Sequence, residues 1–110
     1  MFDPKNTLAF QGSPGAYSDM ACRSAYPEMT TLANRSFEDT FDAVRTGNAA
    51  LAMIPIENSV AGRVADIHHL LPDSGLHIIA EHFQRVNHHL LGVAGAEISD
   101  LTHAHSHIHA

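Results

Sequence analysis

The stretch AMIPIENSVAGRV, residues 52–64, decides the fold and contains an abrupt change of chemistry. It opens with apolar residues, and a carboxylate, an amide and a hydroxyl then follow in a row at Glu57, Asn58 and Ser59. The apolar run 49–56 is continuous, which is typical of a strand buried on both faces of a parallel sheet. The polar cluster that follows it therefore lies where open α/β sheets bind ligands.

The segments around this stretch alternate between strand and helix patterns. Short apolar segments bounded by turn residues predict strands, and apolar residues three or four positions apart predict helices. The predicted strands are 7–11, 30–34 and 49–56, and the predicted helices are 16–26, 36–47 and a third that begins near Val60. Ser36 is the expected cap of the second helix. This β-α-β-α-β-α order predicts an α/β fold with a mostly parallel sheet.

Length and composition restrict the class of protein. A chain of 110 residues is at most one ordinary domain, and its 45% hydrophobic content argues against disorder. No apolar run approaches the roughly 20 residues needed to span a bilayer. The formal charge is −6, with the 6 basic residues scattered, so no nucleic-acid surface is expected. We predict a globular protein without a membrane or nucleic-acid partner.

The cysteine usage and the N-terminal sequence bear on location. Cys22 is the single cysteine, which predicts no disulfide framework. The first ten residues lack a basic region followed by an apolar core, so no signal peptide is expected. Together these features predict a cytoplasmic protein.

The pattern changes after Leu76. The segment 76–95 favours extended structure and has no helix signal, so we expect one or two strands that cross to a second lobe. Four histidines then alternate, and in an extended chain their rings would share one side and could bind zinc, nickel or copper. These residues are His103, His105, His107 and His109. Because no cysteine or carboxylate joins the run, we assign no metal.

The turn QGSPGAYS, residues 11–18, is the first candidate site. Gly12 and Gly15 let the backbone approach a ligand closely. The helix that follows offers unpaired N–H groups, which suit an anion, and Ser18 could add a hydroxyl. The alternative is a tight strand-to-helix turn that needs glycine for its geometry alone.

The segment PIENSVAG, residues 55–62, is the second candidate site. Asn58 or Ser59 is well placed to cap the third helix, and this explains one of the three polar residues. It does not explain Glu57 beside them, nor Gly62, which permits a close approach. A site that holds a polar, oxygen-rich ligand accounts for all of them.

These segments resemble the prephenate dehydratase family. The resemblance rests on LAFQGSPGAYSDMA, residues 8–21, on the segment 36–71 and on HHLLGV, residues 88–93, in the same order and spacing; PIENS-AG-V is its most specific part. It implies a fold of the type II periplasmic-binding class, with two α/β lobes around a cleft. Residues 1–75 would form the first lobe, and residues 76–110 would form crossover strands and an incomplete second lobe.

The resemblance also implies an activity and a set of site residues. Family members convert prephenate to phenylpyruvate, for phenylalanine synthesis, by removing carbon dioxide and hydroxide, and no metal or organic cofactor is implied. Glu57 would lie near the leaving hydroxyl or orient its neighbours, and Asn58 would hydrogen-bond substrate oxygens; these two are the implied catalytic residues. The implied substrate-binding residues are Gly12, Gly15, Ala16, Tyr17, Ser18, Asn58, Ser59, Ser106, His107 and His109.

Three of these positions belong to a segment that matches the family only in part. HSHIHA, residues 105–110, is similar to the family's YSHPQA, and Ser106 and His107 match it. Ile108 stands where proline is usual, and His109 stands where glutamine is usual. Because prephenate carries two carboxylates and the chain is acidic, we expect oriented backbone N–H groups and hydroxyls, more than bulk charge, to bind it.

The departures from the family predict a partial enzyme. The family's Thr-Arg-Phe motif, whose threonine is taken as the general acid, does not occur in these 110 residues, and neither does the regulatory ACT domain. We expect an N-terminal part of a dehydratase that is nearly inactive alone and forms a homo-oligomer through strand edges after Leu76. The alternatives are a non-enzymatic module of the same fold that binds a small carboxylate, and a histidine-rich metal-handling protein.

Overall fold

The computed structural model describes residues 3–58, 62–86, 91, 94–95, 97–100 and 102–103. Its elements run in the order η1 (Pro4–Asn6), β1 (Thr7–Gln11), α1 (Tyr17–Ala25), β2 (Thr30–Asn34), α2 (Phe37–Arg45), β3 (Leu51–Met53), β4 (Glu57–Asn58), β5 (Gly62–Arg63), α3 (Ala65–Leu70) and η2 (Ile98–Asp100). Among the described helices, none has the length and apolar character needed to cross a membrane.

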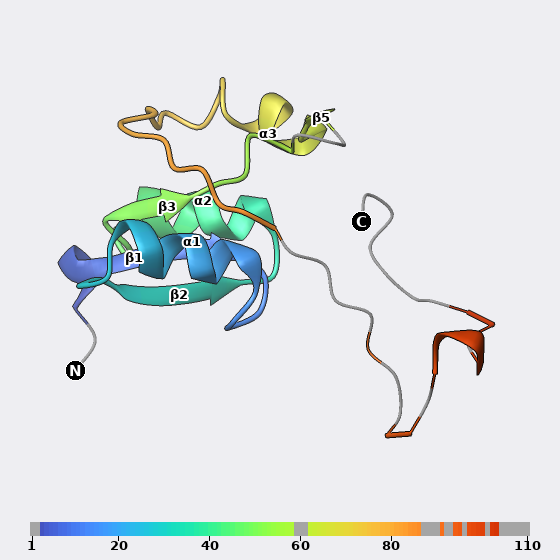
Figure 1. The fold of residues 1–110 in the computed structure, drawn as a ribbon. Helices are drawn as coiled ribbons and strands as arrows, with labels where there is room; N and C mark the ends of the chain where they lie inside the picture. Colours follow the sequence, from blue (N-terminus) through green and yellow to red (C-terminus); the bar gives the residue numbers. More distant parts are fainter. Residues whose placement is uncertain are drawn as a thin grey trace.

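Three parallel strands form the central sheet, in the order β2-β1-β3. Thr7 pairs with Thr30 at the start of β1, and Phe10 pairs with Met53 near its end. The bounds of β1 and β2 are those predicted from the sequence. The predicted α/β class with a parallel sheet, as expected for a lobe of the periplasmic-binding type, is therefore confirmed (Figure 1).

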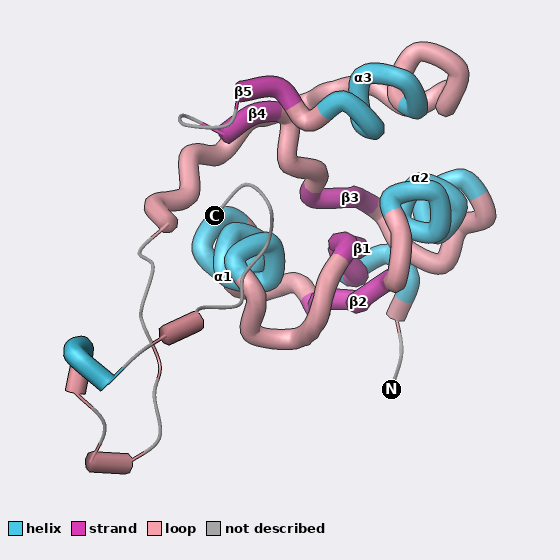
Figure 2. The backbone as a smooth tube through the Cα atoms, turned by 90° about the vertical axis from the view of Figure 1, so that its right-hand side faces the viewer, coloured by secondary structure: helices cyan, strands magenta, loops and turns pink. Residues whose placement is uncertain are grey.

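The two long helices cover opposite faces of the sheet, with α1 on one side and α2 on the other (Figure 2). Alternate side chains of β1 point to the two faces, as the pleat of a strand requires. The cluster on the α1 side consists of Leu8, Phe10 and Cys22, and the cluster on the α2 side consists of Ala9, Ala43 and Ala49. Strand β1 is therefore the one that is buried on both faces.

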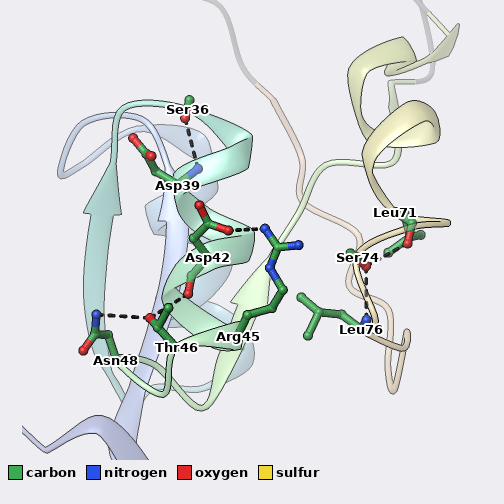
Figure 3. Close-up of polar contacts among 9 residues, drawn as sticks. All are labelled: Ser36, Asp39, Asp42, Arg45, Thr46, Asn48, Leu71, Ser74 and Leu76. Atoms are coloured by element: carbon green, nitrogen blue, oxygen red, sulfur yellow. Dashed lines mark hydrogen bonds and ion pairs between the residues drawn. The ribbon is translucent and has the colours of Figure 1, made fainter.

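Local hydrogen bonds fix both ends of α2 (Figure 3). The Ser36 hydroxyl accepts a hydrogen bond of 3.0 Å from the backbone N–H of Asp39, which confirms the predicted cap. At the other end, the Thr46 hydroxyl donates to the backbone carbonyl of Asp42 over 2.7 Å, and Arg45 forms an ion pair with the Asp42 carboxylate. These contacts are local to α2 and define where it begins and ends.

Strand β3 is shorter and less buried than the sequence predicts. The prediction was a strand over 49–56 with both faces covered, whereas β3 contains only Leu51–Met53 and all three residues are half-buried. The prediction was wrong because β3 is an outer strand of the described sheet and pairs only with β1. The apolar run gave the correct kind of element but not its position in the sheet.

A hairpin replaces the first turn of the predicted third helix. Glu57 of β4 pairs with Arg63 of β5, and Asn58 pairs with Gly62, in an antiparallel ladder. Helix α3 consequently begins at Ala65 rather than near Val60, and its N-cap residue is Val64, without a side-chain cap. The interpretation of Asn58 or Ser59 as a helix cap is therefore wrong, because the helix begins several residues later.

The chain after α3 carries apolar side chains that are exposed. Ser74 is buried; its hydroxyl donates to Leu71 over 2.7 Å and accepts from the N–H of Leu76 over 3.1 Å (Figure 3). Residues 76–86 contain neither helix nor strand, so the predicted strands are wrong for this part, and 87–90 lie outside the described residues. Since no described element covers them, Ile79 and Phe83 are 71% and 87% exposed.

Candidate functional site

The two predicted site segments both begin at the carboxyl end of the parallel sheet. Strand β1 is followed by the turn of residues 12–16, and β3 is followed by residues 54–58. Because β1 and β3 are parallel neighbours, their carboxyl ends lie together. The chain passes from β1 to β2 on one side of β1 and then crosses to β3 on the other side. This change of direction is the place where open α/β sheets bind ligands.

Two glycines shape the turn after β1. Gly12 has φ +133° and Gly15 has φ +87°, which are conformations that other residues rarely adopt. The N–H of Gly12 donates to Asn34 over 2.9 Å, and the N–H of Ala16 donates to Ser13 over 3.0 Å. No other atom would lie within 4 Å of a Cβ added at Gly15, so the turn is open there. Tyr17 and Ser18 then begin α1, with Tyr17 exposed and Ser18 half-buried.

A buried carboxylate lies directly behind this turn. Asp19 has no exposed surface, and its Oδ2 accepts a hydrogen bond of 2.8 Å from the N–H of Gly15. Its Oδ1 accepts from Arg23 Nε over 3.2 Å, and the side chain of Thr31 is a third partner. Burial raises the pKa of Asp19, but the hydrogen bonds from Gly15, Thr31 and Arg23 outweigh it, so the pKa lies below its ordinary value.

Asp19 changes what the start of α1 can bind. The N–H of Gly15 and the N–H of Ala16 already have acceptors within the protein. An ionised carboxylate therefore occupies a position where a helix N-terminus would favour an external anion. Sequence analysis did not single out Asp19, although an acidic residue in the first turn of a helix is a recognisable signal. Anion binding by residues 12–18 stays a prediction.

The second segment lies on the hairpin that follows β3. Glu57 is exposed and begins β4, and the backbone of Asn58 pairs with that of Gly62. The carbonyl of Ile56 accepts a hydrogen bond of 2.9 Å from the N–H of Val64, which closes the base of the hairpin. The predicted site residues Ser59, Ser106, His107 and His109 lie outside the described residues.

An open pocket of about 310 Å³ lies at the carboxyl ends of β1 and β2. Its lining consists of Gln11, Gly12, Ser13, Ala33, Asn34 and Arg35. The Asn34 amide donates to the carbonyls of Phe10 and Leu32, over 3.2 Å and 3.0 Å, so it has a structural role. Gln11, Gly12 and Ser13 belong to the turn predicted as a site, and Gly12 was singled out there. The residues from β2 were missed; the available signal was that β2 ends at the same end of the sheet as β1.

The described part of the chain contains neither a reactive cysteine nor a group of side chains that could bind a metal ion. Cys22 has no exposed surface; burial raises the pKa of its thiol to about 12, and the charge of Asp19 adds to this effect. The thiol is therefore protonated at neutral pH, which fits a packing role better than a nucleophile. No three metal-binding side chains of the described residues lie close enough to share an ion.

The fold and the site together define a class of protein. A parallel α/β lobe with polar segments at its carboxyl end is typical of the lobes of periplasmic-binding folds. A family model, prephenate dehydratase, matches residues 8–110. The chain belongs to the prephenate dehydratase family, and the resemblance found in the sequence is confirmed.

Similar proteins agree with this assignment. The chain is 57% identical, over 100 residues, to a bifunctional N-acyl-homoserine lactone acylase/prephenate dehydratase of Komagataeibacter europaeus, covering 91% of this chain and 36% of that protein. It is 42% identical over 105 residues to arogenate dehydratase/prephenate dehydratase 1, chloroplastic, of Arabidopsis thaliana, covering 96% of this chain and 27% of that protein.

A solved structure also matches. It is GqqA, described as a novel type of quorum quenching acylase, with a TM-score of 0.68 and 60% sequence identity, over 74% of this chain and 42% of that chain. The chain thus spans well under half the length of the proteins it matches. The dehydratase relatives do not favour the non-enzymatic binding module.

Proposed function

We propose that this chain supplies the first-lobe half of a prephenate dehydratase site, for the conversion of prephenate to phenylpyruvate in phenylalanine biosynthesis. The observation that carries the proposal is the parallel pairing of β1 with β3, because it places the turn after β1 and the start of the segment after β3 at the same end of the sheet. Glu57 and Asn58 follow β3 by only four and five residues. The second of these segments belongs to PIENS-AG-V, the part of the sequence most specific to the family. A substrate bound over this end of the sheet would contact both.

The reaction sets the roles of these residues. The bond to the ring carboxylate breaks, its electron pair enters the ring, and the bond to the ring hydroxyl breaks on the far side. A proton must reach the departing oxygen, which leaves as water. By family resemblance, Asn58 holds substrate oxygens and Glu57 lies beside the leaving hydroxyl. The family's acid, the threonine of Thr-Arg-Phe, does not occur in the 110 residues.

The exposed apolar residues support a division into lobes. We assign residues 1–75 to the first lobe and residues 76–110 to the segment that crosses to the second lobe and to the start of that lobe. Ile78, Ile79 and Phe83 are 65%, 71% and 87% exposed, and such side chains are normally covered. Assembly into a homo-oligomer would also cover them.

A cytoplasmic location agrees with the single reduced Cys22.

The test combines binding with turnover. For the 110-residue chain at neutral pH, we expect calorimetry to show prephenate binding and we expect phenylpyruvate to form at close to the uncatalysed rate. Asn58→Ala should weaken binding about tenfold, the loss of about one good hydrogen bond. Asn48→Ala is the matched control. Asn48 precedes β3, at the end of the sheet opposite the candidate site, so this substitution should leave binding unchanged.

Each part of this proposal would be contradicted by a different result. A chain that does not bind prephenate would argue against the proposed substrate. Rapid formation of phenylpyruvate by the 110 residues would show instead that no acid from another segment is needed. Equal loss of affinity in Asn58→Ala and Asn48→Ala would remove Asn58 from the site.

A further inference from the structure

We propose that Arg35 binds a carboxylate of the substrate, in the pocket at the carboxyl ends of β1 and β2. This inference rests on the proposed function and names a residue that determines its specificity. Arg35 follows directly after β2 and lines the pocket with Gln11 and Ser13. Gly12 belongs to the same pocket and to the turn after β1, so the pocket is continuous with the candidate site.

The hydrogen bonds in the pocket leave the Arg35 side chain available. The amide of Gln11 donates to the backbone carbonyl of Arg35 over 3.3 Å, which ties the two strand ends together without using the guanidinium. The Asn34 amide is committed to backbone carbonyls of β1 and β2. Among the described residues, no hydrogen bond or ion pair involves the guanidinium of Arg35. It is the positive group of this pocket.

The charges of neighbouring residues make this guanidinium unusual. Arg23 is paired with Asp19, and Arg45 is paired with Asp42. Glu38 and Asp39 follow Arg35 in the first turn of α2, and neither forms an ion pair with it within the described part of the chain. In a chain with a formal charge of −6, an unpaired guanidinium beside the binding edge is the group that attracts an anion.

Asp19 explains why the carboxylate would bind here rather than at the start of α1. Its buried charge already accepts the hydrogen bond from Gly15. A substrate carboxylate placed over that turn would meet a like charge, whereas the pocket on the β2 side of Gly12 presents Arg35 and the Ser13 hydroxyl. A guanidinium binds a carboxylate through two parallel N–H donors, which a lysine cannot reproduce.

The experiment is a titration of the 110-residue chain with prephenate at neutral pH, followed by amide NMR. Wild-type chain should show shifts at Arg35 as well as at Glu57 and Asn58. Arg35→Gln should raise the dissociation constant about tenfold or more, and Arg35→Lys should recover only part of that loss. Arg85→Gln, which removes an exposed arginine from a segment outside the pocket, should leave the constant unchanged.

The outcomes separate the two proposals. Wild-type affinity in Arg35→Gln, with shifts retained at Glu57 and Asn58, would overturn the role of Arg35 and leave the proposed function standing. If Arg85→Gln lost as much affinity for prephenate as Arg35→Gln, the loss would come from the change in net charge alone. This result would also overturn the role of Arg35. A wild-type chain without shifts at Arg35, Glu57 or Asn58 would contradict both proposals.

Discussion

Replacing Phe10 by alanine is expected to remove most of the stability of the folded chain. Phe10 is 1% exposed in the central strand, where it packs with Leu8 and Cys22 between the sheet and α1. Removing a buried phenylalanine side chain costs about 3–5 kcal/mol, because apolar contacts are lost and a cavity remains. Small domains have a total stability of about 5–15 kcal/mol, and a three-stranded sheet with two small clusters belongs at the lower end.

The chain offers a matched control for this prediction. Phe83→Ala makes the same chemical change at a side chain that is 87% exposed, and it should alter the free energy of unfolding by no more than about 0.5 kcal/mol. Urea unfolding followed by circular dichroism measures both variants. Equal losses would mean that β1 is not the centre of the core, or that Phe83 is covered in solution by a second chain.

Asp19→Ala is expected to have the second largest effect on stability, a loss of about 2 kcal/mol. The substitution removes the acceptor for the Gly15 N–H and for Thr31, and buried acceptors that bind several donors contribute on this scale. The ion pair with Arg23 contributes little, since the Arg23 side chain is 67% exposed. Asp73→Ala, at an exposed carboxylate, is the control and should change stability by less than about 0.5 kcal/mol.

The same carboxylate should make the protein less stable in acid. Because folding lowers the pKa of Asp19, the folded state favours its ionised form. This stabilisation is present above the pKa of the unfolded chain, about 3.9, and is lost as the pH falls through the lower folded pKa. Thermal unfolding between neutral pH and about pH 3 should show a smaller dependence on pH in Asp19→Ala than in wild type. The same dependence in both would contradict the assignment.

Local patterns in the sequence were sufficient for the elements that depend on local interactions. The predicted bounds of β1 and β2 are confirmed, and so is the Ser36 cap, because turn residues and a helix cap act within a few positions. The extent of β3 could not be found in this way, since it depends on which strands lie beside it. The hairpin of Glu57 to Arg63 was missed because each of its strands has only two residues, which is too short to show the alternating pattern of a strand.

For the candidate site too, local patterns predicted some features, and features that depend on neighbouring strands were missed. That the turn after β1 and the segment after β3 share one edge could be predicted from the alternation of elements, and the pairing of β1 with β3 agrees. The roles of Asp19 and Arg35 could not be predicted. Asp19 depends on Thr31 in another strand, and the pocket around Arg35 exists only because β1 and β2 end side by side.

The most direct test of the central claim is the location of prephenate on the 110-residue chain, mapped by amide NMR at neutral pH because prephenate decays in acid. We expect shifts at Gly12–Ser18, at Arg35 and at Glu57–Asn58, which come at or after the carboxyl ends of the three parallel strands. The pocket of about 250 Å³ at the opposite edge, around Asn6 and Tyr26, is the internal control and should not respond. Shifts centred on that pocket, or no shifts at all, would contradict a first-lobe half-site for prephenate.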